Sequence, residues 1–201
     1  MYLIAGLGNP EPEYSKTRHN MGFDTLNRLA TSQNIPLTNH KFKGIYGKGK
    51  IEEEDVILLK PQTYMNLSGK CIKRYMDFYK IKPEKLIVVY DDMDTQPGTI
   101  RVRKQGNSGS HNGMKSIIEE LGITDFARIR VGIGKPSYAI DKINFVIGKL
   151  GTQEYSSLVD GVEKAKEALV CMLAEGYDIA MNKYNEKKKG DTSEGNSNNE
   201  A

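Results

Sequence analysis

LIVVYDDMDTQPG, at residues 86–98, is the stretch that decides the fold class of this 201-residue chain. Its first five residues are apolar without a break and include three β-branched side chains, a pattern typical of a central strand buried on both faces. Asp91, Asp92 and Asp94 follow directly. Because ligand sites in open α/β sheets form at the carboxyl ends of strands, these carboxylates are predicted to point into a crevice.

Strand and helix patterns alternate on both sides of this stretch. Further strands are expected at 1–6, 41–51, 55–59, 99–103 and 127–134, and helices at 21–32, 67–79, 113–121 and 154–174. The alternation predicts an α/β fold, a single domain at 1–185 with a twisted mixed, mainly parallel sheet flanked by helices. The polar stretch 186–201 is expected to be a disordered tail, because it has too few apolar residues to bury.

The composition, with 38% hydrophobic and 27% charged residues, is ordinary for a soluble globular protein. Cys71 and Cys171 lie far apart in sequence and are expected to be free thiols in a reducing compartment. No signal peptide and no apolar run of about 18 residues is seen, so a cytoplasmic protein without membrane contact is expected. The net charge of +3 is compatible with a polyanionic partner but does not identify one.

Three familiar signatures are incomplete. Gly6 and Gly8 follow a strand, but Glu11 stands where a dinucleotide-binding loop needs its third glycine. Residues 44–50 spell GxxxxGK, yet Ile51 replaces the Ser or Thr that would hold Mg²⁺. The serines at 108 and 110 lack the glycines of a GxSxG nucleophile elbow. A nucleotide site and a nucleophilic serine are therefore disfavoured.

The histidines are more informative. His19 and His111 each precede an asparagine at a loop-to-helix junction, with Asn20 a plausible N-cap of the first helix, whereas His40 sits in a polar turn. A neutral imidazole at such a junction can reach a substrate, although structural use is the better interpretation for either histidine alone.

The aspartates and two asparagines leave several interpretations open. Asp91, Asp92 and Asp94 fit a divalent metal site, a His–Asp pair or a simple acidic turn, and spacing alone does not choose among these. Asn9 and Asn66 are expected in the same crevice, where an amide could hold a carbonyl or position water. For either asparagine in isolation, a turn residue or a helix cap is the favoured interpretation.

Together these residues resemble the bacterial-type peptidyl-tRNA hydrolase family. Five blocks carry the resemblance: GLGNPEPEYSKTRHNMGF (6–23), LLKPQTYMNLSG (58–69), IVVYDDMDTQPG (87–98), GNSGSHNGMKSIIEELG (106–122) and FARIRVGIGKP (126–136). They occur in order over residues 1–150, which makes the resemblance highly specific. It implies hydrolysis of the ester bond that joins peptide to tRNA, with tRNA as the partner, no metal or other cofactor, and a monomer.

The resemblance also implies roles for individual residues. His19 is similar to the general base that takes a proton from water, and Asp91 to the carboxylate that orients it. Asn9 and Asn66 are similar to residues that place the substrate and support charge on the carbonyl oxygen. The implied binding residues are His111 and Asn112 for water and the peptide main chain, Tyr14, Tyr64 and Met65 for the terminal adenosine and peptide, and Arg103 and Arg130 for the tRNA 5′-phosphate.

Three positions depart from the family pattern. Asn107 and Ser110 stand in a loop that is often richer in glycine, and Tyr64 stands where phenylalanine is common. Two other functions remain in competition: a non-catalytic RNA-binding protein on the same scaffold, and a metal-dependent hydrolase that uses the three aspartates. The first predicts substitutions at the base or its partner, and none are seen.

Overall fold

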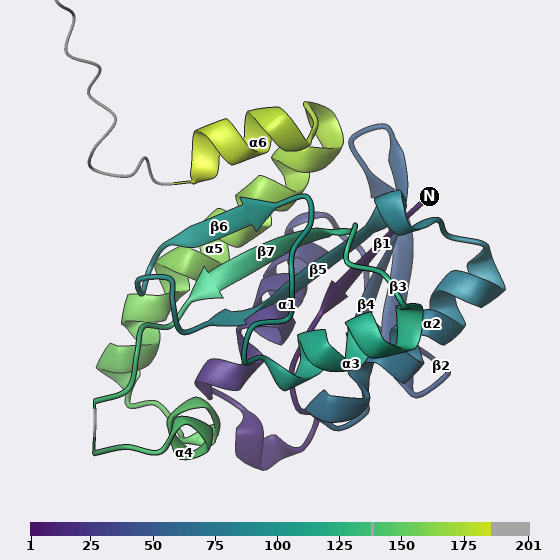
Figure 1. Ribbon diagram of the computed structural model, residues 1–201. Helices are drawn as coiled ribbons and strands as arrows, with labels where there is room; N and C mark the ends of the chain where they lie inside the picture. The colour runs from purple at the N-terminus through teal and green to yellow at the C-terminus, as the bar shows by residue number, and fades with distance from the viewer. Residues whose placement is uncertain (138, 186–201) are drawn as a thin grey trace, which may run out of the picture.

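The computed structural model describes residues 1–137 and 139–185, so the expected tail at 186–201 lies outside the described residues. The described chain forms one seven-stranded sheet with helices on both faces (Figure 1). The strands are β1 (Tyr2–Gly6), β2 (Asn39–Lys41), β3 (Gly44–Ile51), β4 (Glu54–Pro61), β5 (Leu86–Asp92), β6 (Ile100–Arg103) and β7 (Ala127–Gly132).

The strand order is β2-β3-β4-β1-β5-β7-β6. The four central strands, β4, β1, β5 and β7, pair in parallel. The pairs at the edges are antiparallel: β2 with β3 and β3 with β4 on one side, and β6 with β7 on the other. The predicted mixed, mainly parallel sheet is therefore confirmed. β1 has β4 on one side and β5 on the other, so the chain changes direction across the sheet at β1, where the carboxyl ends of β1 and β5 border a crevice.

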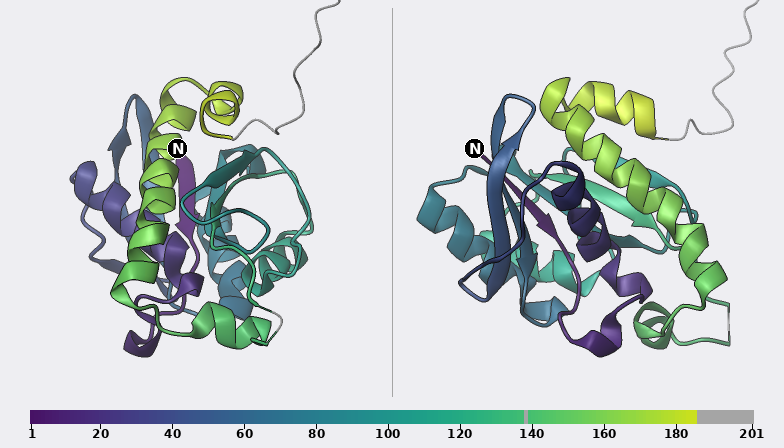
Figure 2. Two further views of the ribbon diagram at one scale, coloured as in Figure 1. Left: turned by 90° about the vertical axis from the view of Figure 1, so that its left-hand side faces the viewer. Right: turned by 180° about the vertical axis from the view of Figure 1, so that it is seen from behind.

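Six α-helices and four short 3₁₀ helices are described. The α-helices are α1 (Met21–Ser32), α2 (Ser68–Tyr79), α3 (Asn112–Leu121), α4 (Lys142–Ile147), α5 (Thr152–Ala174) and α6 (Tyr177–Tyr184). The 3₁₀ helices are η1 (Pro12–Tyr14), η2 (Arg18–Asn20), η3 (Met65–Leu67) and η4 (Pro83–Lys85). Helices α2 and α3 cover one face of the sheet, and α1 and α5 cover the other (Figures 1 and 2).

Alternation along the central strands feeds a separate core on each face. In β1, Leu3 and Ala5 pack with α2 and α3, whereas Ile4 packs with α1 and α5. β5 divides in the same way, with Val88 on the first face and Val89 on the second. Because both faces are covered, every residue of β5 is buried, and this explains the unbroken apolar run at 86–90.

The structure differs from the predicted elements mainly where local patterns are weak. β2, α4 and α6 were not predicted, because β2 has three residues, none of them buried, α4 buries no side chain and α6 buries only Ala180. The strand predicted at 127–134 ends at Gly132, and the helix predicted at 67–79 begins at Ser68 after the 3₁₀ turn η3. Cys71 and Cys171 are buried free thiols, as predicted.

In the part of the chain that the structure describes, no helix combines the length and the apolar character needed to span a bilayer.

Candidate active site

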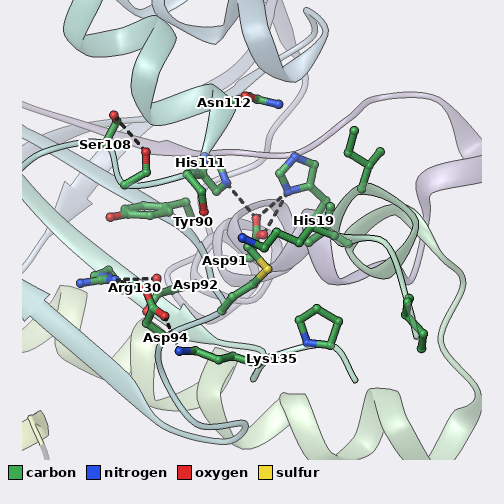
Figure 3. A pocket seen from close by; sticks show the side chains of 18 of the residues that line it. His19, Tyr90, Asp91, Asp92, Asp94, Ser108, His111, Asn112, Arg130 and Lys135 are labelled. Atoms are coloured by element: carbon green, nitrogen blue, oxygen red, sulfur yellow. Dashed lines mark hydrogen bonds and ion pairs between the residues drawn. The ribbon is translucent and has the colours of Figure 1, made fainter. Parts of the chain in front are cut away.

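Three segments that are distant in sequence meet at the carboxyl end of the sheet. η2, between β1 and α1, carries His19; β5 carries Asp91; and the residue before α3 is His111. Their side chains converge on one another in Figure 3. The meeting of His19 with Asp91 follows from the fold, because the loop after β1 lies over the end of the neighbouring parallel strand β5.

Asp91 is the centre of this group. Its Oδ1 and Oδ2 atoms lie 2.9 Å and 3.0 Å from Nδ1 of His19, and Oδ1 lies 3.0 Å from Nε2 of His111. The carboxylate is 3% exposed, so these two imidazoles replace the water that would otherwise solvate it. The structure therefore contains the His–Asp pair that was one of the open interpretations of Asp91, and it adds a second histidine to it.

The hydrogen bonds fix which nitrogen of His111 carries its proton. Nδ1 of His111 accepts a hydrogen bond from the backbone N–H of Met114, 3.2 Å away, and so acts as the N-cap of α3. A nitrogen that accepts has no proton, so the proton of neutral His111 is on Nε2 and is donated to Asp91. Both ring nitrogens of His111 are therefore occupied.

His19 has the opposite arrangement. Its Nδ1 faces both oxygens of Asp91 and donates to the carboxylate, which leaves the lone pair of the neutral ring on Nε2. Nε2 has no hydrogen-bond partner among the described residues, and His19 lines the cavity at this end of the sheet. Of the two histidines, only His19 presents an unoccupied basic nitrogen.

Electrostatics supports the same distinction. Burial alone would lower the pKa of His19, but the charge and hydrogen bonds of Asp91 outweigh it and raise the pKa above its ordinary value. Burial would raise the pKa of Asp91, yet His19 and His111 together hold that pKa well below its usual range. Asp91 therefore stays ionised while His19 gains and loses a proton.

Asn9 is held from two sides. The Asn20 side chain brackets the Asn9 backbone: Asn20 Oδ1 accepts from the Asn9 N–H at 2.8 Å, and Nδ2 donates to the Asn9 carbonyl at 3.1 Å. The Asn9 Oδ1 atom accepts from the backbone N–H of Met65 at 3.1 Å. Because Oδ1 faces a donor, the second amide atom, Nδ2, is a donor, and it has no hydrogen-bond partner among the described residues.

Asn20 therefore has a different role from the one expected. It occupies the N-cap position of α1, but its side chain makes no capping hydrogen bond, and it orders the Asn9 loop instead. The local pattern predicts a cap because Asn before a helix usually serves as one. Contact with a residue eleven positions earlier decides the outcome here.

A second charged cluster lies beyond Asp91. Nη2 of Arg130 lies 2.6 Å from Oδ1 of Asp92, whose other oxygen accepts a hydrogen bond from the Thr95 hydroxyl. Asp94 is exposed and pairs with Lys135 at 3.2 Å. Asp91 thus faces two imidazoles and Asp92 a guanidinium, while Asp94 pairs with an ammonium group and lies 3.9 Å from the same guanidinium.

These clusters line a cavity of about 740 Å³. Among the predicted site residues, His19, Asp91, His111, Asn112 and Arg130 line it. The others stand outside that lining: Asn9, Tyr14, Tyr64, Met65, Asn66 and Arg103. Tyr64 is 62% exposed, and Asn66 is exposed on η3. In the sheet, Arg101 lies opposite Arg130, which lines the cavity. Arg103 is two residues further along β6, opposite Arg128, and so lies further from the cavity.

The metal interpretation can be compared with this geometry. In the described chain, the potential ligand atoms that lie within 4.8 Å of one another belong to His19, Asp91 and His111, rather than to the three aspartates. A metal there would need the nitrogens that now donate to Asp91, and His111 would lose the N-cap bond from Met114 when its proton moved. The arrangement is that of a hydrogen-bonded triad.

The loop before His111 does not need extra glycines. Its positive φ angles fall on Gly106 (152°) and Gly109 (57°), so Asn107 and Ser110 occupy ordinary conformations. Arg128, on the neighbouring strand β7, holds the loop in place. It is 1% exposed, and its Nη1 donates to the carbonyls of Gly106 and Asn107 at 2.7 Å and 3.3 Å. This buried arginine was missed from sequence, where it resembled any charged residue on a strand.

Comparison with known proteins agrees with this geometry. The family model described as peptidyl-tRNA hydrolase matches residues 3–192. Curated proteins named peptidyl-tRNA hydrolase from Alkaliphilus metalliredigens and Lachnoclostridium phytofermentans are 47% and 45% identical. The alignments cover 92% of this chain and 100% of the first protein, and 94% of this chain and 98% of the second.

Solved structures give the same result. The crystal structure of peptidyl-tRNA hydrolase from Acinetobacter baumannii superposes with a TM-score of 0.84 at 41% sequence identity, covering 90% of this chain and 93% of that chain. A complex of peptidyl-tRNA hydrolase with N-propanol gives a TM-score of 0.85 at 39% identity with the same coverage. The chain therefore belongs to the peptidyl-tRNA hydrolase family, a family of hydrolases.

Proposed function

We propose that this protein hydrolyses the ester bond of peptidyl-tRNA, releasing the peptide and free tRNA, with His19 as the general base. The observation that carries the proposal is the unoccupied Nε2 of a histidine whose Nδ1 is bound to a buried carboxylate. An ester joining a peptide to a ribose is an activated bond, so one positioned base together with stabilisation of the oxyanion is a sufficient set of catalytic groups.

In the proposed reaction, Nε2 of His19 takes a proton from a water molecule as the water oxygen attacks the ester carbonyl carbon. Asp91 stabilises the imidazolium that forms, because its charge and its hydrogen bonds favour the protonated ring. The imidazolium then returns the proton to the ribose oxygen as the C–O bond breaks. The products are a peptide with a free carboxyl group and a tRNA with a free hydroxyl group.

Asn9 is proposed to support the charge that develops on the carbonyl oxygen. Its Nδ2 is a free donor, while its other polar atoms are held by Asn20 and Met65. A donor that is fixed before the reaction needs no reorganisation when the oxyanion forms. Asn66, on the exposed turn η3, is proposed to assist in placing the substrate.

The resemblance gives the attacking water and the peptide main chain to His111 and Asn112 together. Because both ring nitrogens of His111 are occupied, Asn112, exposed at the first turn of α3, is proposed to make this contact. His111 is proposed to support it by fixing Asp91 through its Nε2–H. Tyr14, Tyr64 and Met65 remain the proposed walls for the terminal adenosine and the peptide.

The cationic side of the site is proposed to bind tRNA phosphate. Arg130 and Lys135 line the cavity, and a guanidinium can bond a phosphate through two parallel N–H groups. Arg103 is proposed to contact the same end of the tRNA from outside the cavity. Contacts of this kind are independent of base sequence and suit an enzyme that accepts many tRNAs.

The decisive experiment measures release of an N-blocked amino acid from tRNA by the wild-type protein and by His19→Ala. Loss of a general base should lower turnover by roughly 10²–10⁴-fold, while the Kd for tRNA stays within about twofold because His19 makes no proposed phosphate contact. His40→Ala, on the exposed edge strand β2, is the matched histidine control and should retain full activity.

Two results would contradict the proposal in different ways. Turnover by His19→Ala close to that of the wild type would remove His19 from the mechanism. A wild-type protein that binds tRNA but releases no peptide would reject the hydrolase activity and favour the non-catalytic RNA-binding function.

A further inference from the structure

Arg130 and Asp92 form a short ion pair in the cavity, and Asp92 has no role in the proposed reaction. Nη2 of Arg130 lies 2.6 Å from Oδ1 of Asp92, and Asp92 is 8% exposed. Figure 3 shows this pair on the cavity wall away from His19. The carboxylate is itself fixed, because its Oδ2 accepts a hydrogen bond from the Thr95 hydroxyl.

The pair leaves one nitrogen of the guanidinium available. Nη1 of Arg130 has no hydrogen-bond partner among the described residues, and its Nε is buried without one. A guanidinium has five N–H donors, so a carboxylate can hold one of them while a second anion binds others. Lys135 lines the same cavity, so the open part of Arg130 and an ammonium group contribute positive charge to one wall.

We propose that Asp92 is a positioning residue that holds the Arg130 guanidinium in the orientation that receives a phosphate group of the tRNA. This inference rests on the proposed function. An unrestrained arginine loses side-chain freedom when it binds a phosphate, and a partner that orders it beforehand removes that cost. The chain of contacts from Thr95 to Asp92 to Arg130 is the arrangement by which buried hydrogen bonds orient a binding group.

Asp92 has an opposing effect as well, since its negative charge partly neutralises Arg130. The geometry favours positioning, because the carboxylate is buried and its oxygens are engaged by Arg130 and Thr95. A phosphate that binds Nη1 does not have to displace Asp92. Removing the carboxylate should therefore weaken phosphate binding, because the Arg130 side chain is no longer held in one orientation.

The test compares Asp92→Asn with the wild type on two substrates, a peptidyl-tRNA with its 5′-phosphate and the same molecule after dephosphorylation. The KM for the phosphorylated substrate should rise by about tenfold, because an arginine side chain that is no longer ordered beforehand has to be ordered when the phosphate binds. The KM for the dephosphorylated substrate should change less than about twofold, and kcat should be unchanged for both, because the contact exists before and during the reaction.

Two further variants sharpen the test. Asp94→Asn removes the same charge from the same wall, but its carboxylate is 70% exposed and lies 3.9 Å from Arg130, so KM should remain near the wild-type value. In an Arg130→Gln background, Asp92→Asn should have no further effect on KM, because a positioning residue acts only through the group that it positions.

The alternative outcomes each reject the inference. A lower KM for Asp92→Asn would show that Asp92 competes with phosphate. Equal KM changes for both substrates, or an effect that persists with Arg130→Gln, would show a general structural role. Wild-type protein that cleaves neither substrate would overturn the proposed function itself, and phosphorylated tRNA binding measured with Asp92→Asn would then decide the role of Asp92 separately.

Discussion

At the scale of single residues, the chemistry of the site depends on which ring nitrogens of His19 and His111 carry a proton. Asp91 accepts a hydrogen bond from both His19 and His111. The Met114 N–H binds the second ring nitrogen of His111, whereas the second ring nitrogen of His19 has no hydrogen-bond partner in the described chain. Two histidines with similar sequence surroundings therefore have different chemical capacities. This difference comes from one backbone N–H at the start of α3.

Asp91→Asn should change the pH dependence as well as the rate. Turnover requires neutral His19, so kcat/KM of the wild type should rise with pH through a midpoint above the ordinary histidine value, since Asp91 raises the pKa of His19. Without the carboxylate, burial alone acts on His19 and lowers its pKa, so the midpoint should move to lower pH. The plateau should fall by about 10²–10⁴-fold because the ring loses its fixed orientation.

The measurement is kcat/KM between about pH 5 and 9, a range that brackets the usual histidine pKa. Asp94→Asn is the matched control and should keep the wild-type midpoint, since Asp94 pairs with Lys135 and Arg130 rather than with a histidine. A midpoint for Asp91→Asn at or above that of the wild type would contradict the assignment of Asp91 as the residue that raises the pKa of His19.

At the scale of secondary-structure elements, the position of His19 depends on how closely α1 approaches the sheet. Gly22, in the first turn of α1, lies against backbone: a Cβ there would be 2.4 Å from the amide nitrogen of Leu7 and from the carbonyl oxygen of Val89. The N–H of Phe23 also donates to the Leu7 carbonyl at 3.2 Å. These contacts fix the start of α1, and hence the preceding turn η2, against the ends of β1 and β5.

Gly22→Ala should destabilise the protein although alanine is the better helix former. The new methyl group would collide with backbone atoms, which cannot rotate away, and overpacking of this kind costs about 1–3 kcal/mol. Urea unfolding should show the loss as a lower midpoint with an unchanged slope. Because η2 would be displaced from Asp91, kcat should also fall.

Gly161→Ala in α5 is the matched control for this prediction. A Cβ at Gly161 would lie 3.3 Å from Cγ1 of Val131, a close contact with a side chain that needs a shift of only a few tenths of an ångström. The change should therefore cost less stability than Gly22→Ala and leave kcat unchanged. If Gly22→Ala proved as stable and as active as Gly161→Ala, close approach of α1 would not be what positions His19.

At the scale of the whole molecule, charge and shape are arranged around one end of the sheet. The chain carries a net charge of only +3, so attraction for a polyanion has to come from local groups such as Arg130 and Lys135 in the cavity. The helices α1, α2, α3 and α5 cover the two faces of the sheet (Figures 1 and 2). The cavity that Asp91 and His19 line lies at the carboxyl end of β5. The substrate class follows from that end of the molecule rather than from its overall charge.

A small set of phosphate contacts predicts a modest dependence on salt. With about two contacts, the logarithm of kcat/KM for peptidyl-tRNA should fall with the logarithm of salt concentration with a slope of about −2. Hydrolysis of an N-blocked aminoacyl adenosine, which lacks those phosphates, should be nearly independent of salt and serves as the control. Equal slopes for the two substrates would argue against a phosphate-binding wall in the cavity.

The sequence by itself determined the fold class and the catalytic candidates. An unbroken apolar run at 86–90 requires a strand covered on both faces, and alternating patterns require helices to cover it. Asn9 and Asp91 lie at or just beyond the carboxyl ends of β1 and β5, and His19 lies just before α1, so the pattern predicts all three near one end of the sheet. Their individual roles come from the resemblance to the family, because spacing alone leaves several interpretations of Asp91 open.

Only the tertiary structure decided how those residues are used. Three contacts show this: Asn20 binds the Asn9 backbone, the Met114 N–H binds His111, and Arg130 pairs with Asp92. They join groups in residues that lie 3 to 38 positions apart. Each depends on rotamers and on the packing of neighbouring elements, which no periodicity records. A sequence pattern states which face of an element is buried, whereas a hydrogen bond depends on the positions of two atoms after the whole chain has folded.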